Sequence, residues 1–220
     1  MIDGNDTDAL LGVLDDAPLD EVAGRLVRAA AKDLDCDHAS VMVLFPRRTV
    51  DVVAATDDVV RRLDQAQLDL NEGPCLDAVT HDPVVTSDQV GNDQRWPAWG
   101  PWVADEGFSS MLSVRLFTAD RVIGALNVYG SEPRQFDQDD VAAALLHGHR
   151  GAALLALSQR HEQLREAIDR RHHIGIAQGI LMSQYGLDEE GSFDVLRRYA
   201  RDSNRKLRDV ASDVIARRHR

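Results

Sequence analysis

The sequence predicts an α+β fold in which a central antiparallel sheet, flanked by helices, precedes a long helix and a small helical bundle. Five short segments rich in β-branched residues are expected to form the sheet: 40–45, 50–56, 83–88, 110–117 and 121–130. Before them, apolar residues in 19–34 recur at the three- and four-residue spacing of a helix. From residue 137 the helical pattern returns and dominates the rest of the chain.

Two pairs of these strands are separated by short turns and therefore predict hairpins. Residues 46–48 lie between the first pair and residues 118–120 between the second. Short helices are expected at 58–67 and 75–80. The segment 91–108 holds all three tryptophans and two prolines, and we expect it to be mainly loop.

The long helix carries a pattern that favours self-association. It has no proline between residues 139 and 182. A short run of apolar residues at alternating spacings of three and four is typical of a coiled-coil seam: Leu154, Leu157, His161, Leu164 and Ile168. This run spans only about two heptads, so a helix that packs on its own domain is the alternative to a dimer.

The C-terminal helices predict a small three-helix bundle. Gly186 is expected to end the long helix, and Asp188 to cap a second helix that begins at residue 189. Ser203 or Asn204 would cap a third helix, which reaches residue 217. The apolar faces of the three helices predict the bundle core: Ile174, Ala177, Ile180, Leu181, Phe193, Leu196, Ala200, Leu207, Val210, Ala211 and Val214.

Charge divides the chain into two parts. The formal net charge is −12, but residues 159–220 contain 13 Lys and Arg against 10 Asp and Glu, a net of +3. The preceding residues carry 12 against 27, a net of −15. The first part would repel a polyanion, whereas the second would not.

Several functional classes have no support in the sequence. The two cysteines, Cys36 and Cys75, form no metal-ligand spacing. Motifs of hydrolases, metalloproteases and P-loop enzymes are absent, so we expect no catalytic residues, no metal and no enzyme activity. No apolar run reaches the ~20 residues of a membrane span, and no signal peptide is visible. These features favour a cytoplasmic protein that does not bind membranes.

A basic cluster lies across the turn between the last two helices. Six cations occur within twelve residues: Arg197, Arg198, Arg201, Arg205, Lys206 and Arg208. The planar guanidinium group suits phosphate and stacks on unpaired bases. Only Asp202 and Asp209 stand out as accompanying acids. The alternative is an ordinary solvated face.

At this point the C-terminal third resembles the ANTAR family, three-helix modules that bind RNA in bacterial transcription antitermination. The resemblance rests on about 50 residues in matching order: Arg171, Ile174, Ala177, Gly179, Ile180, Leu181, Met182, Phe193, Leu196, Arg197, Ala200, Asn204, Lys206, Leu207, Val210 and Ala211. Gln178 stands where the family usually has lysine, and Gly191 where it usually has alanine.

Together, the cluster and the resemblance give a set of candidate RNA-binding residues. They are Arg171, His173, Ala177, Gln178, Gly179, Arg197, Arg198, Arg201, Asn204, Arg205 and Lys206. The small surface at Ala177 and Gly179 would accept either loop bases or a neighbouring helix. Tyr199 could stack on a base or pack against the bundle.

The first part of the chain resembles a GAF domain. Four segments carry this resemblance: 73–79, 93–99, 110–116 and 123–130. We therefore expect a GAF-like sensory domain at 1–155, followed by a coiled-coil linker and an ANTAR domain at 156–220. Trp96, Trp99 and Tyr129 could line a pocket for an unknown small molecule, or could simply form core. No cofactor is identified.

These observations predict a transcription antitermination regulator. The GAF-like domain would sense a signal, the connecting helix would form a homodimer, and the ANTAR domains would hold hairpins of a leader transcript. The alternative is a ligand-sensing dimer whose C-terminal bundle binds a protein partner. Duplex DNA binding is a third and weaker hypothesis.

Overall fold

The computed structural model describes residues 17–46 and 49–217. The chain divides into two compact units, Met1–Arg160 (unit 1) and His161–Arg220 (unit 2), and each is described by itself. Arg47 and Arg48, in the expected turn of the first hairpin, lie outside the described residues, as do the first 16 residues of the predicted sensory domain.

Unit 1 is built on a five-stranded antiparallel sheet with the order β2-β1-β5-β4-β3. The strands are β1 (His38–Phe45), β2 (Thr49–Ala55), β3 (Val84–Ser87), β4 (Ser110–Phe117) and β5 (Val122–Gly130). Both expected hairpins, β1 with β2 and β4 with β5, are confirmed by their antiparallel registers. The central strand β5 is buried on both faces from Ile123 to Gly130 because helices cover the sheet on both sides.

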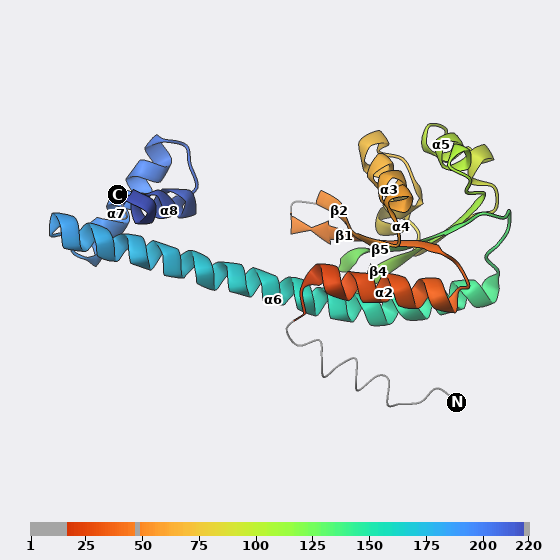
Figure 1. Ribbon diagram of the computed structural model, residues 1–220, viewed down its shortest axis with the longest axis horizontal. Helices are drawn as coiled ribbons and strands as arrows, with labels where there is room; N and C mark the ends of the chain where they lie inside the picture. Colours follow the sequence, from red (N-terminus) through yellow and green to blue (C-terminus); the bar gives the residue numbers. More distant parts are fainter. Residues whose placement is uncertain (1–16, 47–48, 218–220) are drawn as a thin grey trace, which may run out of the picture. The chain divides into compact units, whose positions relative to one another are not determined.

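Two layers of helices enclose this sheet (Figure 1). The helix α2 (Leu19–Asp33) and the first part of α6 (Gln138–Tyr185) cover one face, where Leu26, Leu126 and Leu155 share a core. The helices α3 (Asp58–Leu70), α4 (Pro74–Thr80) and α5 (Trp99–Asp105) cover the other face. The result is the predicted α+β architecture.

The helix α5 lies inside the segment 91–108, which the sequence predicts to be mainly loop. A short 3-10 helix, η2 (Val90–Asn92), overlaps the start of this segment. Pro101 occupies the third position of α5. The first-turn N–H groups of a helix have no partner within the helix, so a proline there costs no hydrogen bond. The breaker residues were therefore compatible with a helix start.

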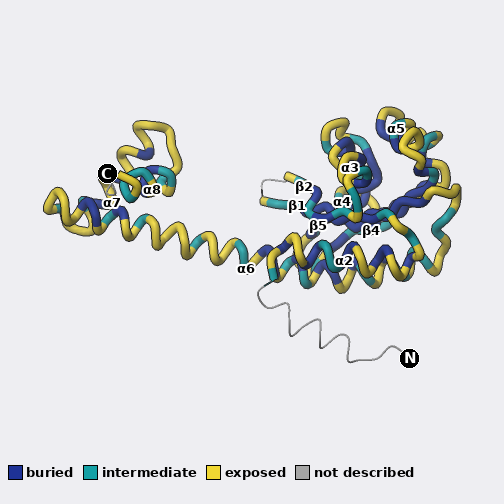
Figure 2. The backbone as a smooth tube through the Cα atoms, in the orientation of Figure 1, coloured by how far each residue is buried: buried dark blue, intermediate teal, exposed yellow. Residues whose placement is uncertain are grey.

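Unit 2 is a bundle of the last part of α6 with α7 (Glu189–Asp202) and α8 (Leu207–Arg217). Its core contains Ala177, Leu181, Leu196, Ala200, Val210 and Ala211. Figure 2 shows that buried stretches alternate with exposed ones along the backbone of this unit. Gly186 follows α6 with a φ of 67°, the left-handed conformation that glycine adopts without steric cost. The predicted cap at the start of α7 is confirmed, because the Asp188 side chain accepts a hydrogen bond from the Gly191 N–H.

The turn between α7 and α8 differs from the expectation. The Ser203 hydroxyl donates to the Tyr199 carbonyl at 2.6 Å, so it completes the end of α7 and does not cap α8. Asn204 has a φ of 51° and donates its backbone N–H to the Arg201 carbonyl. Asparagine tolerates this left-handed conformation better than most residues, which gives Asn204 a structural role in the turn.

Candidate nucleic-acid interface

The basic cluster lies on the surface of unit 2, at the outer side of α7 and across the turn into α8. The side chains of Arg197, Arg198 and Arg201 are 70%, 79% and 76% exposed. They belong to α7, whose buried face consists of Ser192, Leu196 and Ala200. Arg205 and Lys206 occupy the turn, and Arg208 follows in the first turn of α8. One segment of the bundle therefore presents all six cations to solvent.

Acidic neighbours partly neutralise the cluster. Arg197 pairs with Asp194 at 2.9 Å, and Arg205 pairs with Asp213 at 2.6 Å. Arg198 and Arg201 share Asp202, and Arg208 pairs with Asp209. The sequence of the cluster itself contains only Asp202 and Asp209, because Asp194 and Asp213 precede and follow it along the chain. Helix spacing and the α7–α8 turn bring these two acids to the arginines.

These ion pairs are exposed and exchangeable. A solvent-exposed pair contributes about 0–1 kcal/mol, and salt screens it further. A phosphate group that accepts two hydrogen bonds from one guanidinium can therefore replace an aspartate at small cost. In the described part of the chain, Lys206 forms none of the ion pairs found for the rest of the cluster.

The candidates on α6 fall into two groups. Arg171, His173 and Gly179 are exposed, and a side-chain atom added at Gly179 would meet open space. Ala177 is fully buried in the bundle core, so the expectation that its side chain would meet loop bases is wrong. It lies on the face of α6 that packs against α7 and α8, the position that the apolar spacing also predicted for the bundle core.

Gln178 has an internal structural role. Its Nε2 donates to the Glu189 carbonyl at 3.1 Å and lies 3.5 Å from the Ser192 hydroxyl. The same hydroxyl donates to the Glu189 carbonyl at 2.8 Å. Gln178 thus fastens α6 to the first turn of α7, and its amide is not free to contact phosphate in this arrangement.

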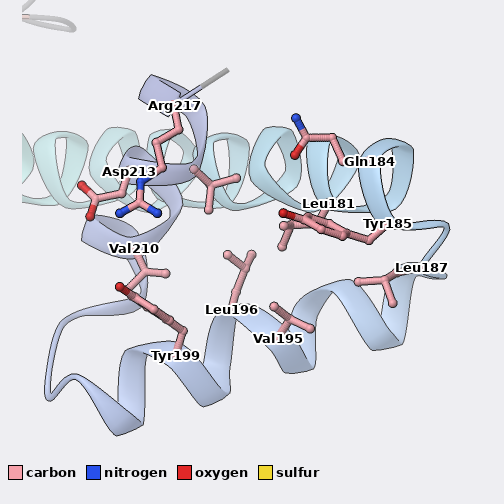
Figure 3. Close-up of a pocket in the computed structure, with 11 residues that line it drawn as sticks. Leu181, Gln184, Tyr185, Leu187, Val195, Leu196, Tyr199, Val210, Asp213 and Arg217 are labelled. Atoms are coloured by element: carbon pink, nitrogen blue, oxygen red, sulfur yellow. The ribbon is translucent and has the colours of Figure 1, made fainter. Parts of the chain in front are cut away.

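A groove of about 570 Å³ opens between the three helices of unit 2 (Figure 3). Its apolar floor includes Leu181, Leu196 and Val210, and two exposed tyrosines, Tyr185 and Tyr199, stand at its walls. Polar side chains complete the lining: Gln184, Asp213 and Arg217. Tyr199 was a candidate from the sequence, whereas Tyr185 was not, although it continues the four-residue spacing of Ala177 and Leu181 along α6.

The three aromatic candidates of unit 1 are sealed in its second core. Trp96, Trp99 and Tyr129 are at most 1% exposed. The Trp96 Nε1–H donates to Asp77 Oδ2 and the Trp99 Nε1–H donates to the Leu63 carbonyl, both at 2.9 Å. None of these three side chains lines the groove of unit 2 or a second cavity near Phe108. Their observed role is core packing, so a ligand could touch them only if this core opened.

A buried polar network adjoins the three aromatic residues. Asp64 Oδ1 accepts hydrogen bonds from the Tyr129 hydroxyl at 2.7 Å, from Gln67 Nε2 at 2.9 Å and from Asn127 Nδ2 at 3.1 Å. Its second oxygen has no partner among the described residues. Burial raises the pKa of Asp64 to about 6, although these hydrogen bonds oppose the shift.

The network also fixes the start of α4. Gln67 Oε1 accepts the Cys75 N–H at 2.9 Å, and Gly73 before it has a φ of 142°. A side-chain atom at Gly73 would collide with the Gln67 side chain.

Burial raises the pKa of the Cys75 thiol and raises that of Cys36 to about 11. Although Cys75 lies in the first turn of α4, its thiol is buried, and desolvation keeps it protonated.

The connecting helix exposes apolar residues on one side. Leu157, Leu164 and Ile168 are 41%, 54% and 65% exposed, whereas Leu154 and His161 are half-buried. In unit 1 the opposite side of α6 packs on the sheet through Ala144, Ala152 and Leu155.

No helix of the described residues has the length and apolarity that crossing a membrane requires.

The fold and the site define a class of regulatory protein: an enclosed α+β domain joined by a long helix to a bundle with an exposed basic surface. Family comparison agrees with this class. A GAF domain model matches residues 16–156, and an ANTAR domain model matches residues 162–215. The chain belongs to the GAF domain family and carries an ANTAR domain after it, the architecture of a sensor-regulated transcription antitermination regulator.

Solved structures support the fold of unit 1. The GAF domain of an Acinetobacter phosphoenolpyruvate-protein phosphotransferase is 14% identical, with a TM-score of 0.53, and covers 74% of this chain and 99% of its own. A GAF domain from Synechocystis sp. PCC6803, in a photoproduct state, is 13% identical with a TM-score of 0.52, covering 67% and 98%. At these identities the likeness concerns the fold alone. No curated protein matches the chain.

Proposed function

We propose that this protein binds RNA hairpins of a leader transcript through residues 156–220 and receives a signal through residues 1–155. The observation that carries the proposal is the exposed basic cluster on α7, the following turn and α8, inside the matched ANTAR domain. Holding a hairpin would prevent an overlapping terminator from forming, which is how such binding would regulate transcription.

Phosphate contacts supply the affinity in this proposal. Each arginine exchanges its aspartate for a phosphate, and counterions leave the RNA. Contacts to phosphate fix the position of the protein, whereas selectivity needs contacts to unpaired bases. The remaining candidates, Arg171, His173, Gly179, Asn204 and Lys206, are exposed and able to contribute. Ala177 and Gln178 are left out because both serve the bundle itself.

The connecting helix would form the homodimer. Leu157, Leu164 and Ile168 leave apolar area in water within each chain, and a second copy of the helix would cover it. A dimer would carry two ANTAR domains and so hold two hairpins at once. The linkage raises the effective concentration of the second domain after the first has bound.

The signal would act on unit 1. We propose a small molecule that enters when this core opens, because the buried network at Asp64 leaves one carboxylate oxygen without a partner among the described residues. Both matched domains are regulatory, and the proposed activity requires no catalytic step.

An electrophoretic shift assay with a tandem-hairpin RNA tests the proposal. The triple variant Arg197→Ala, Arg198→Ala, Arg201→Ala should bind roughly ten- to hundred-fold more weakly, because it loses three phosphate contacts. The slope of log affinity against log salt should also become shallower by about 2, at ~0.7 per phosphate. A matched control replaces three exposed cations of unit 1, Arg28, Lys32 and Arg62, and should bind like the unaltered protein.

A substitution that removes an acidic side chain is expected to have the opposite effect on RNA binding. Asp202 pairs with both Arg198 and Arg201, so Asp202→Asn should free them and strengthen binding a few-fold at low salt. Equal binding by the unaltered protein and the triple variant would refute the cluster. Absence of RNA binding, together with capture of a protein through the same bundle, would instead support the alternative of a protein partner.

A further inference from the structure

The groove of unit 2 contains two aromatic side chains that its own fold does not use. Tyr185 is 69% exposed and Tyr199 is 50% exposed, although both stand beside buried leucines (Figure 3). Hydrogen bonds with the rest of the bundle are found for neither hydroxyl in the described residues. A tyrosine that packs for stability covers its ring and satisfies its hydroxyl, as Tyr129 does in unit 1.

We propose that this groove, lined by Tyr185, Tyr199, Leu196 and Val210, holds an unpaired nucleobase of the bound RNA. The inference rests on the proposed RNA binding and names the element that reads the RNA. Unpaired bases are recognised by aromatic rings that stack on them and by polar groups that meet their edges. The groove supplies both, with Gln184 and Asp213 as donor and acceptor groups at its lining.

Continuity with the basic cluster favours a base over other occupants. Asp213 lines the groove and forms an ion pair with Arg205 of the cluster at 2.6 Å. Arg217 lines the groove itself and adds a cation there. A backbone whose phosphate replaced Asp213 at Arg205 would therefore run beside the groove, where an adjacent base can enter it.

Size and chemistry agree with this occupant. A volume of about 570 Å³ is typical of a site that encloses one small molecule, and a nucleobase is flat, apolar on its faces and polar at its edge. The lining has the same division, with apolar side chains in the floor and charged or amide groups among the others. Loop bases thus have a site on the bundle that does not require the buried Ala177.

The test measures binding of fluorescein-labelled tandem-hairpin RNA by anisotropy, with intact loops and with abasic loops. Tyr199→Ala should weaken binding of the intact RNA roughly ten-fold and leave binding of the abasic RNA unchanged. Tyr199→Phe keeps the ring and should bind like the unaltered protein. Phe193→Ala is the matched control, because Phe193 is an exposed aromatic on the same helix that does not line the groove.

The outcomes separate this inference from the proposed function. If Tyr199→Ala and Tyr185→Ala bind both RNAs like the unaltered protein, while binding still depends on the arginines, the groove assignment fails and RNA binding stands. If Phe193→Ala loses binding instead, the base lies on the other flank of α7. If the unaltered protein binds neither RNA, both proposals fail, and the result favours a protein as the partner that binds in the groove. The unaltered protein should bind the abasic RNA more weakly than the intact RNA, and this comparison tests the inference even if a variant misfolds.

Discussion

Aromatic residues serve opposite purposes in the two units. In unit 1, Trp96, Trp99 and Tyr129 are at most 1% exposed, and each donates a side-chain hydrogen bond within the unit. In unit 2, Tyr185 and Tyr199 are at least half exposed and line an open groove. The same class of side chain stabilises the fold in one place and remains available for recognition in the other. Burial and hydrogen bonding separate the two roles.

Charged groups repeat the difference. In unit 1, Asp64 is fully buried and receives three hydrogen bonds from neighbouring side chains. In unit 2, the arginines of the basic cluster are exposed and paired with aspartates that a phosphate can replace. The buried charge of unit 1 is therefore part of its core, whereas the charges of unit 2 lie outside its core and are accessible to a partner.

The largest effect is expected when a core aromatic residue of unit 1 is removed, and it is a loss of folding stability. Trp99→Ala should lower the free energy of unfolding of unit 1 by about 3–5 kcal/mol, because it leaves a cavity and removes the hydrogen bond from Trp99 Nε1 to the Leu63 carbonyl. Urea unfolding followed by tryptophan fluorescence measures it, since all three tryptophans lie in unit 1. Tyr199→Ala in the same assay should change nothing measurable. Equal losses for the two variants would remove the distinction between core and recognition aromatics.

A second and smaller effect concerns pH. The pKa of Asp64 rises from its ordinary value of 3.8 to about 6 in the folded protein. Between these values the unfolded chain releases the proton while the folded protein keeps it, so the free energy of unfolding falls as pH rises. At ~1.4 kcal/mol per pH unit the loss amounts to about 3 kcal/mol and is complete above about pH 6.

The substitution Asp64→Asn removes this titration. The stability of the variant relative to the unaltered protein should increase between about pH 4 and pH 6, then stay constant. Asp93→Asn is a contrasting control, because Arg95 lowers the pKa of Asp93 to about 2. Asp93 stabilises the fold above pH 3.8, and this contribution is lost as pH falls toward 2. Parallel pH profiles for Asp64→Asn and the unaltered protein would contradict the account of the buried network.

Local signals predicted the order of elements well. The β-branched runs and turns gave both hairpins, and Gly186 with Asp188 marked the end of α6 and the start of α7. These local signals failed where one residue type is compatible with two kinds of structure. Prolines at 97 and 101 suggested a loop, yet a proline is also compatible with the first turn of a helix, as Pro101 is in α5.

The candidate site was less predictable because it depends on contacts between helices. Ala177 matched both a core position and a small open surface, and only packing shows that it is core. Gln178 meets Glu189 and Ser192 from the next helix, which no local pattern reveals. The groove at Tyr185 and Tyr199 needs three helices to form. Exposure of the arginines, in contrast, followed directly from the spacing of Leu196 and Ala200 on α7.

Native mass spectrometry of the full chain with a tandem-hairpin RNA tests the central claim most directly. It reports the number of chains, the bound RNA and any small molecule retained by unit 1. We expect two chains with one tandem-hairpin RNA, and dissociation of the RNA as ammonium acetate is raised. A single chain that carries no RNA at low salt would contradict the account.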